Sequence, residues 1–152
     1  MIYWQWKKFD ELATEELYQV LRLRAEIFVV EQHCPYQDLD NSDQAAWHLL
    51  GWHSDNTGSR TLCAYLRAFA PGVKYQEIAL GRVLVKTAHR KSGLGRELMA
   101  QAISRVHQEF ADSAIRISAQ SHLQTFYCEL GFARVSEPYD EDGIPHIEML
   151  KI

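Results

Sequence analysis

The sequence predicts a mixed α/β (α+β) domain over residues 1–152, with a central twisted mixed sheet and helices on both faces. Three observations lead to this prediction. Two apolar runs flank a polar turn in the first half, which indicates an antiparallel hairpin. Strands and helices alternate in the second half, which requires a parallel crossover. The 152 residues are 47% hydrophobic and 24% charged, as expected for one soluble core without covalent staples.

The N-terminal segment combines one strand with one long amphipathic helix. Residues 2–7 alternate enough to form a strand. Thr14 has the character of a capping residue, and the two glutamates after it favour a helix start. The helix ends near Pro35, because proline excludes the preceding residue from the helical region. The apolar residues recur at roughly helical spacing: Leu17, Val20, Leu21, Leu23, Ala25 and Phe28.

The predicted hairpin follows a polar, acidic loop at residues 36–43. Residues 46–53 and 61–70 are its two strands. Residues 55–59 (DNTGS) form the turn between them, since Asp, Asn and Gly suit tight turns.

The second half has the clearer periodicity. Residues 95–110 repeat apolar side chains at steps of three and four, which predicts a helix. A second, short helix is stopped by Gly131. In order, the elements are a strand at 77–85, the helix at 95–110, a strand at 115–119, a helix at 123–130, and strands at 132–136 and 147–152.

Composition excludes several classes of protein. The formal net charge of −4 argues against nucleic-acid or anionic-membrane partners, which favour a basic surface. The three scattered cysteines, without a CxxC pair, fit a reducing compartment. The N-terminus lacks the features of a signal peptide, and no run approaches the roughly 20 apolar residues of a membrane span. We therefore expect a cytoplasmic protein.

The loop between the strand at 77–85 and the helix at 95–110 has the composition of a phosphate site. Glycines let the backbone approach an anion, and the first amides of a helix lack internal partners. Lys91 and Arg96 would add positive charge. Glycine spacing alone leaves a plain turn with a basic face equally open, and neither common nucleotide fingerprint is matched. The loop residues are Arg90, Lys91, Ser92, Gly93, Leu94, Gly95 and Arg96.

Two motifs in order resemble the GNAT superfamily of N-acetyltransferases. The first is the loop at residues 90–95 (RKSGLG) directly after an apolar strand. The second is residues 126–132 (FYCELGF), beyond the next predicted strand. Residues 28–38 (FVVEQHCPYQD) and 142–147 (DGIPHI) resemble the ElaA-type branch of small bacterial GNAT proteins. The resemblance covers nearly the whole chain and implies a single-domain GNAT acyl-CoA N-acyltransferase fold.

The resemblance implies a co-substrate, acetyl-CoA, and a role for each motif. The amides of Lys91 through Arg96 would cradle the pyrophosphate. Tyr127 would protonate the departing thiolate, although a core aromatic is the alternative reading. The strand residues Val83, Leu84 and Val85 would offer backbone groups to the pantetheine arm and the thioester carbonyl.

The sequence departs from the family pattern in two places. Gln120 stands where many relatives keep an asparagine that contacts CoA. Ala79 stands where histone-type relatives keep a glutamate base. The general base is therefore open; the candidates are Glu77, on the strand face of Ala79, and Glu31, His48 and His146.

The resemblance places an acidic run near the loop that usually covers the acceptor site in GNAT folds, and this run suggests a cationic amine. Glu31, Asp38, Asp40 and Asp43 form an acidic run that could attract a cation, although a solvated loop is the plainer interpretation of each one. Cys128, beside Tyr127, is expected to pack in the core rather than to carry an acetyl group. The histidines and cysteines match no metal-ligand spacing, so we expect no metal.

Three functions remain open from the sequence. The first is acetyl transfer from acetyl-CoA to a small-molecule or protein amine by direct attack in a ternary complex. The second is a GNAT-fold module or sensor that binds CoA with little or no transferase activity, and the third is an adaptor with a chance glycine loop. The oligomeric state is equally open. The four tryptophans, Trp4, Trp6, Trp47 and Trp52, suit either a core or a homodimer interface.

Overall fold

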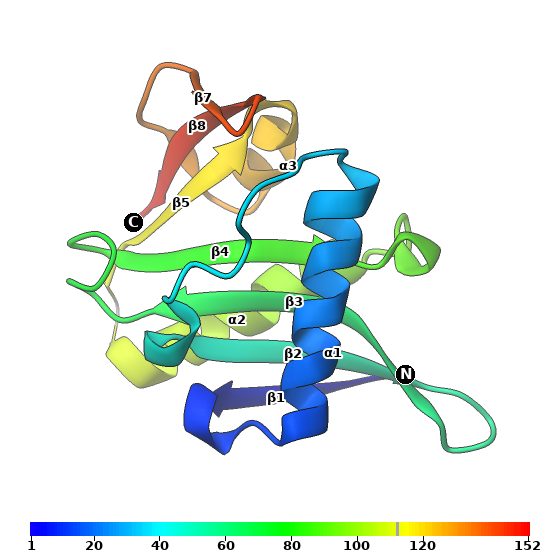
Figure 1. Cartoon of the computed structure of the whole chain (residues 1–152). Coiled ribbons are helices and arrows are strands. Elements are labelled where there is room, and N and C mark those ends of the chain that lie inside the picture. Colours follow the sequence, from blue (N-terminus) through cyan, green and yellow to red (C-terminus); the bar gives the residue numbers. More distant parts are fainter. Residues whose placement is uncertain (112) are drawn as a thin grey trace.

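One eight-stranded mixed sheet organises the chain (Figure 1), and the computed structural model describes residues 1–111 and 113–152. The strand order is β1-β2-β3-β4-β5-β8-β6, with β7 paired to β8. β4 and β5 are the parallel pair, and the other neighbours are antiparallel. The strands are β1 (Ile2–Lys8), β2 (Trp47–Ser54), β3 (Arg60–Phe69), β4 (Ile78–Val85), β5 (Ile115–Gln120), β6 (Ala133–Arg134), β7 (Tyr139–Glu141) and β8 (Ile144–Lys151).

Helices cover both faces of the sheet, as the sequence predicts. Figure 1 shows α1 (Thr14–Arg24) across one face and α2 (Leu94–Phe110) behind the other. Side chains along β3 alternate between the two faces of the sheet and so contribute to the hydrophobic core on each face. Tyr65 packs on the α1 side, and Leu66 packs on the α2 side. The third helix, α3 (Gln124–Glu129), follows β5 after a short 3-10 turn.

The first helix differs from the prediction at both ends. Ala13, not Thr14, is the N-cap, and the Ala13 amide donates to the Glu16 carboxylate at 2.8 Å. Thr14 is therefore the first helical residue rather than the capping one. Beyond Arg24 the chain continues as a π-helix over Ala25–Glu31, a form that apolar spacing does not distinguish from an α-helix.

The sequence analysis did not predict the hairpin that β7 forms with the last strand, β8. β7 pairs with β8 through a two-residue turn, Asp142-Gly143, in which both residues have positive φ. Asp-Gly at such a turn is a strong hairpin signal, and it could have located β7. The last strand accordingly begins at Ile144 rather than at residue 147, and β6 covers only two residues of the predicted strand at 132–136.

The tryptophans stabilise the β1 edge of the sheet. Trp6 stacks on Trp47 with ring centroids 5.2 Å apart. Trp52 is buried and donates to Gln5, and Trp4 donates to Glu97 of α2. These contacts are internal to the chain. None of the described helices has the length and apolar character needed to cross a membrane.

Candidate active site

The site begins where β4 and β5 separate. The two strands pair only through Ile78 with Ile115, Ala79 with Arg116, and Leu80 with Ile117. On its other side, β4 has a bulge opposite β3. Leu84 pairs with Tyr65 and Gly81 pairs with Arg67, so β4 advances three residues where β3 advances two. Arg82 within this bulge has φ of 50°. A bulge bends its strand, so the last half of β4 turns away from β5 and leaves backbone groups there without a partner strand.

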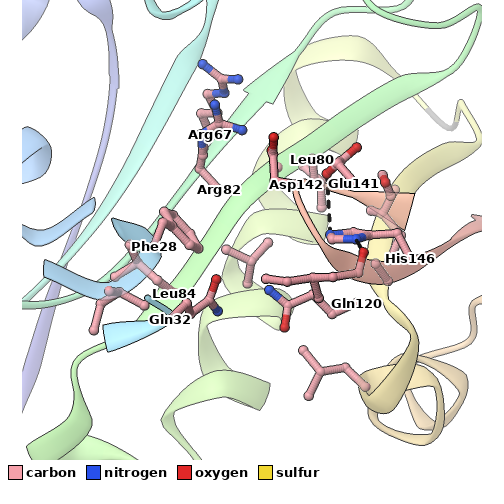
Figure 2. Close-up of a pocket in the computed structure, with 18 of the residues that line it drawn as sticks. Phe28, Gln32, Arg67, Leu80, Arg82, Leu84, Gln120, Glu141, Asp142 and His146 are labelled. Carbon is pink, nitrogen blue, oxygen red and sulfur yellow. Dashed lines mark hydrogen bonds and ion pairs between the residues drawn. The ribbon is translucent and has the colours of Figure 1, made fainter. Parts of the chain in front are cut away.

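A cavity of about 640 Å³ fills the opening between these strands. Figure 2 shows Phe28, Gln32 and Leu84 on one side, and Gln120 and His146 on the other. The volume lies within the range of small-molecule sites. Of the predicted site residues, the cavity is lined by Val83, Leu84, Val85, Arg90, Gly95, Gln120, Tyr127, Glu31, Asp40 and His146. The remaining loop residues, Lys91, Ser92, Gly93, Leu94 and Arg96, lie at the start of α2 outside this lining.

The first turn of α2 presents free amides beside the cavity. Gly93 caps the helix in the left-handed region, with φ of 83°. The first intrahelical bond runs from the Glu97 amide to the Gly93 carbonyl at 3.1 Å. The amides of residues 94–96 therefore have no partner inside the helix, and they lie at the positive end of its dipole. The Arg96 guanidinium pairs with Glu129, so its charge is partly compensated, unlike the free charge that the sequence suggested.

Tyr127 is enclosed between the motif aromatics and the cavity. Its ring packs edge-to-face with Phe126 and Phe132, at centroid distances of 5.1 and 5.9 Å. Burial raises the pKa of Tyr127 to about 12. The phenol therefore stays protonated at neutral pH and can act as a donor toward the cavity that it lines.

Comparison with known proteins identifies this arrangement. A family model for the acetyltransferase (GNAT) domain matches residues 68–152. Protein ElaA of Escherichia coli is 40% identical over 153 aligned residues, covering 99% of this chain and 97% of ElaA. The chain belongs to the GNAT acetyltransferase family. This membership supports acyl transfer from an acyl-CoA.

Solved structures with the GNAT fold match this chain over its full length. The crystal structure of Escherichia coli ElaA matches with a TM-score of 0.91, at 40% identity and with full coverage of both chains. An acyl-CoA N-acyltransferase from Pseudomonas aeruginosa matches with a TM-score of 0.92, also at 40% identity and with full coverage of both chains. A more distant match is an aminoglycoside 6'-N-acetyltransferase complexed with coenzyme A, with a TM-score of 0.66 at 16% identity over 97% of this chain and 96% of that one. At that identity the likeness concerns the fold alone.

Three arginines and three aspartates form an ion network at one end of the GNAT cavity. Arg67 binds Asp40 at 2.6 Å and Asp43 at 2.9 Å. Hydrogen bonds from Arg67 hold the pKa of Asp40 well below its usual range. The network balances three positive charges against three negative ones. Its members are Arg24, Arg67, Arg82, Asp38, Asp40 and Asp43.

This network changes the meaning of the acidic run in the sequence. Each of its aspartates is matched by arginine, so the run carries little excess negative charge. Glu31 is compensated too, because Arg90 donates to both of its carboxylate oxygens, at 3.1 and 2.7 Å. Thr87 adds a third hydrogen bond to Glu31 at 2.6 Å. Glu31 therefore links the π-helix to the loop after β4 rather than offering a free charge to a cation.

Two candidate bases lie away from the GNAT cavity. Glu77 precedes β4, is absent from the lining, and accepts hydrogen bonds from Arg116 at 3.0 and 3.3 Å. Glu77 therefore does not line the cavity that Ala79 lines. His48 is fully buried, with Nδ1 2.6 Å from the Tyr65 hydroxyl and Nε2 3.0 Å from the Asp43 carbonyl. Burial lowers the pKa of His48, which makes it a neutral core histidine.

His146 does line the cavity, and the β7–β8 hairpin brings two further carboxylates to it. Glu141 and Asp142 belong to the lining although the sequence analysis assigned them no role. The same holds for Phe28, Gln32 and Tyr36, which come from the segment around the π-helix. Most of these residues lie within the two ElaA-type segments, 28–38 and 142–147, but the resemblance alone gave none of them a role at the site.

The expectation for Cys128 is wrong. Cys128 is exposed, not packed in the core, and it is absent from the cavity lining. Its position on α3 turns it away from the site that Tyr127 lines. Within residues 1–111 and 113–152, no three His, Cys, Asp or Glu side chains gather in a way that could hold a metal ion.

Proposed function

We propose that this GNAT protein transfers an acetyl group from acetyl-CoA to a primary amine by direct attack while both substrates are bound. One observation carries the proposal. One cavity, opened by the divergence of β4 and β5, is lined by Gly95 of the first turn of α2, by Tyr127 and by His146, Glu141 and Asp142 of the β7–β8 hairpin. Donor, leaving group and acceptor can thus each meet a suitable group of the protein.

The residues present fit a CoA thioester as substrate. The amides of residues 94–96 suit its pyrophosphate, and the left-handed Gly93 keeps that approach clear, since nothing lies within 4 Å of where its Cβ would be. Val83, Leu84 and Val85 line the opening and can offer backbone groups to the pantetheine arm and the carbonyl. Gln120 lines the opposite wall.

The transfer needs a neutral amine and a protonated leaving group. The amine nitrogen forms a bond to the thioester carbon, the carbon–sulfur bond breaks, and the sulfur gains a proton. Tyr127 is the donor for that proton, because it lines the cavity and burial keeps its phenol protonated. Cys128 has no place in this reaction, since it lies on the surface away from the cavity.

A thiol-release assay tests the proposal. The purified protein is incubated with acetyl-CoA and one amine at a time. The amines are putrescine, ethanolamine, lysine methyl ester and a lysine-containing peptide. We expect CoA release that depends on at least one amine, with the acetamide product identified by mass spectrometry. Decanoyl-CoA in place of acetyl-CoA tests the acyl preference, and faster transfer of the longer chain would contradict acetyl specificity.

The same assay separates the enzyme from a CoA-binding module. Binding of acetyl-CoA without amine-dependent thiol release from any acceptor would favour the module. Neither binding nor release would contradict the donor site itself.

A further inference from the structure

The β7–β8 hairpin holds a histidine beside a carboxylate at the cavity wall. Tyr139 pairs with His146, and Glu141 pairs with Ile144, across the Asp142-Gly143 turn. The His146 side chain is 9% exposed and lines the cavity, while the Glu141 carboxylate is half-exposed. In Figure 2 both groups lie on the side of the cavity opposite Arg67 and Arg82.

The hydrogen bonds of His146 define which ring nitrogen is basic. Nδ1 lies 2.7 Å from the Ile144 carbonyl oxygen. A carbonyl only accepts hydrogen bonds, so Nδ1 carries the proton in the neutral ring. The lone pair is then on Nε2, which lies 3.3 Å from a carboxylate oxygen of Glu141.

The charges around His146 also favour a cation. Tyr139 of β7 stacks on its ring at 6.2 Å, and its partner in β5, Gln120, is uncharged. Among the four carboxylates in the described lining, Glu31 and Asp40 are paired with arginine, whereas Glu141 and Asp142 are not. Across the cavity, Arg82 is already engaged with aspartate. The hairpin is therefore the part of the wall with uncompensated negative charge.

We infer that His146, supported by Glu141, is the general base for the acceptor, and that the acceptor is an alkyl amine which arrives as an ammonium ion. This inference rests on the proposed acyl transfer. An ammonium has three N–H donors, so it can bond to Nε2 of His146 and to the Glu141 carboxylate together.

The proton steps balance as follows. His146 Nε2 takes one proton from the ammonium and later releases it to solvent. The neutral amine then forms the nitrogen–carbon bond as the carbon–sulfur bond breaks. Tyr127 gives its proton to the sulfur, and the second proton lost by the nitrogen returns to Tyr127. The products are an acetamide and CoA thiol.

The experiment compares the wild-type protein with His146→Gln in the thiol-release assay with saturating acetyl-CoA. General-base catalysis contributes about a hundredfold or more, so we expect kcat/KM for the amine to fall at least that far near neutral pH. The loss should shrink at high pH, because an alkyl amine such as a lysine side chain deprotonates by itself at about pH 10.4. Glu141→Gln should give a smaller loss, about tenfold, in the same direction.

A matched control separates this role from a structural one. His107→Gln changes a partly buried histidine on α2, outside the cavity lining, and should leave the pH profile unchanged. Acetyl-CoA binding and thermal unfolding of His146→Gln should match the wild type. An active His146→Gln protein with the wild-type profile would overturn the inference while leaving the proposed function intact. Failure of the wild type to acetylate any amine would overturn both.

Discussion

Tyr127 has two properties that a leaving-group donor needs: access to the cavity and a firmly held proton. Burial among aromatic rings supplies the second, since it raises the pKa of Tyr127 to about 12. The Tyr127 phenol is therefore protonated at every ordinary pH, but it is a weak acid and gives up its proton less readily. The proposed proton transfer from Tyr127 therefore depends on charge that develops on the sulfur as the bond breaks.

Replacing Tyr127 by phenylalanine keeps the ring and removes the donor. We expect kcat to fall about tenfold to a hundredfold, with little change in acetyl-CoA affinity, because the hydroxyl acts on the departing sulfur. The wild type should show no titration from this residue below about pH 11. Steady-state kinetics and a pH profile measure both. An unchanged kcat would place Tyr127 in the core alone.

At the residue scale, sequence reasoning succeeded where a motif fixes the neighbours. Tyr127, Arg90 and Gly95 line the cavity, and the rest of the loop at 90–96 lies at the start of α2 outside the lining. It failed for charged residues whose partners are distant in sequence. Glu77 could not be paired in advance with Arg116, 39 positions away. Charge patterns predict a surface only when the partners of each charge are known.

At the element scale, the site depends on a strand bulge and on a helix start. Periodicity predicted both β4 and α2, because each has a continuous apolar pattern. The divergence of β4 from β5 was not predictable in the same way. It depends on the register between β3 and β4 around Arg82, and alternation along one strand does not report register.

The start of α2 provides an element-scale prediction. Gly93→Ala places a Cβ at φ of 83°, where an L-residue is strained, although the space is open. We expect a loss of about 1 kcal/mol in the free energy of unfolding. Gly81→Ala is the matched control: its Cβ would also meet nothing within 4 Å, but its φ is not positive. It should be neutral or slightly stabilising, by up to about 1 kcal/mol. Urea unfolding measures both, and equal losses would contradict the account.

At the scale of the whole molecule, the ion network joins α1, the acidic loop and two sheet strands. Arg24 is completely buried and reaches Asp38 and Asp43, 14 and 19 positions along the chain. A buried charge is tolerated only when it is paired, so this network orders the loop against the sheet beside the cavity. The overall fold class and the two helical layers followed from the sequence. The network did not, since it consists of contacts between distant residues.

Asp43 gives the network a pH signature. Burial tends to raise the pKa of Asp43, but hydrogen bonds and charge from Arg24 and Arg67 outweigh it, so the pKa lies below its ordinary value. Its stabilising effect is thus complete above about pH 4, the unfolded value, and is lost as pH falls through the lower folded pKa. Asp43→Asn should cost about 3–5 kcal/mol at neutral pH and weaken the acid dependence of stability.

Unfolding at neutral and acid pH checks this, with Asp55→Asn in the exposed turn as the control. That variant should retain most of the wild-type stability, since surface changes are usually small. Equal losses from the two substitutions would show that the buried network has no special role.

The most direct test of the central claim is calorimetric titration of acetyl-CoA into the wild type, Gly95→Asp and Ser104→Asp. Gly95 lines the cavity in the first turn of α2, and Ser104 is exposed further along the same helix. Both variants add one negative charge to α2, but only the first adds it beside the expected pyrophosphate. The account predicts that the wild type and Ser104→Asp bind acetyl-CoA alike, and that Gly95→Asp binds at least about tenfold more weakly. Folded wild-type protein that does not bind acetyl-CoA, or equal affinity in all three proteins, would contradict it.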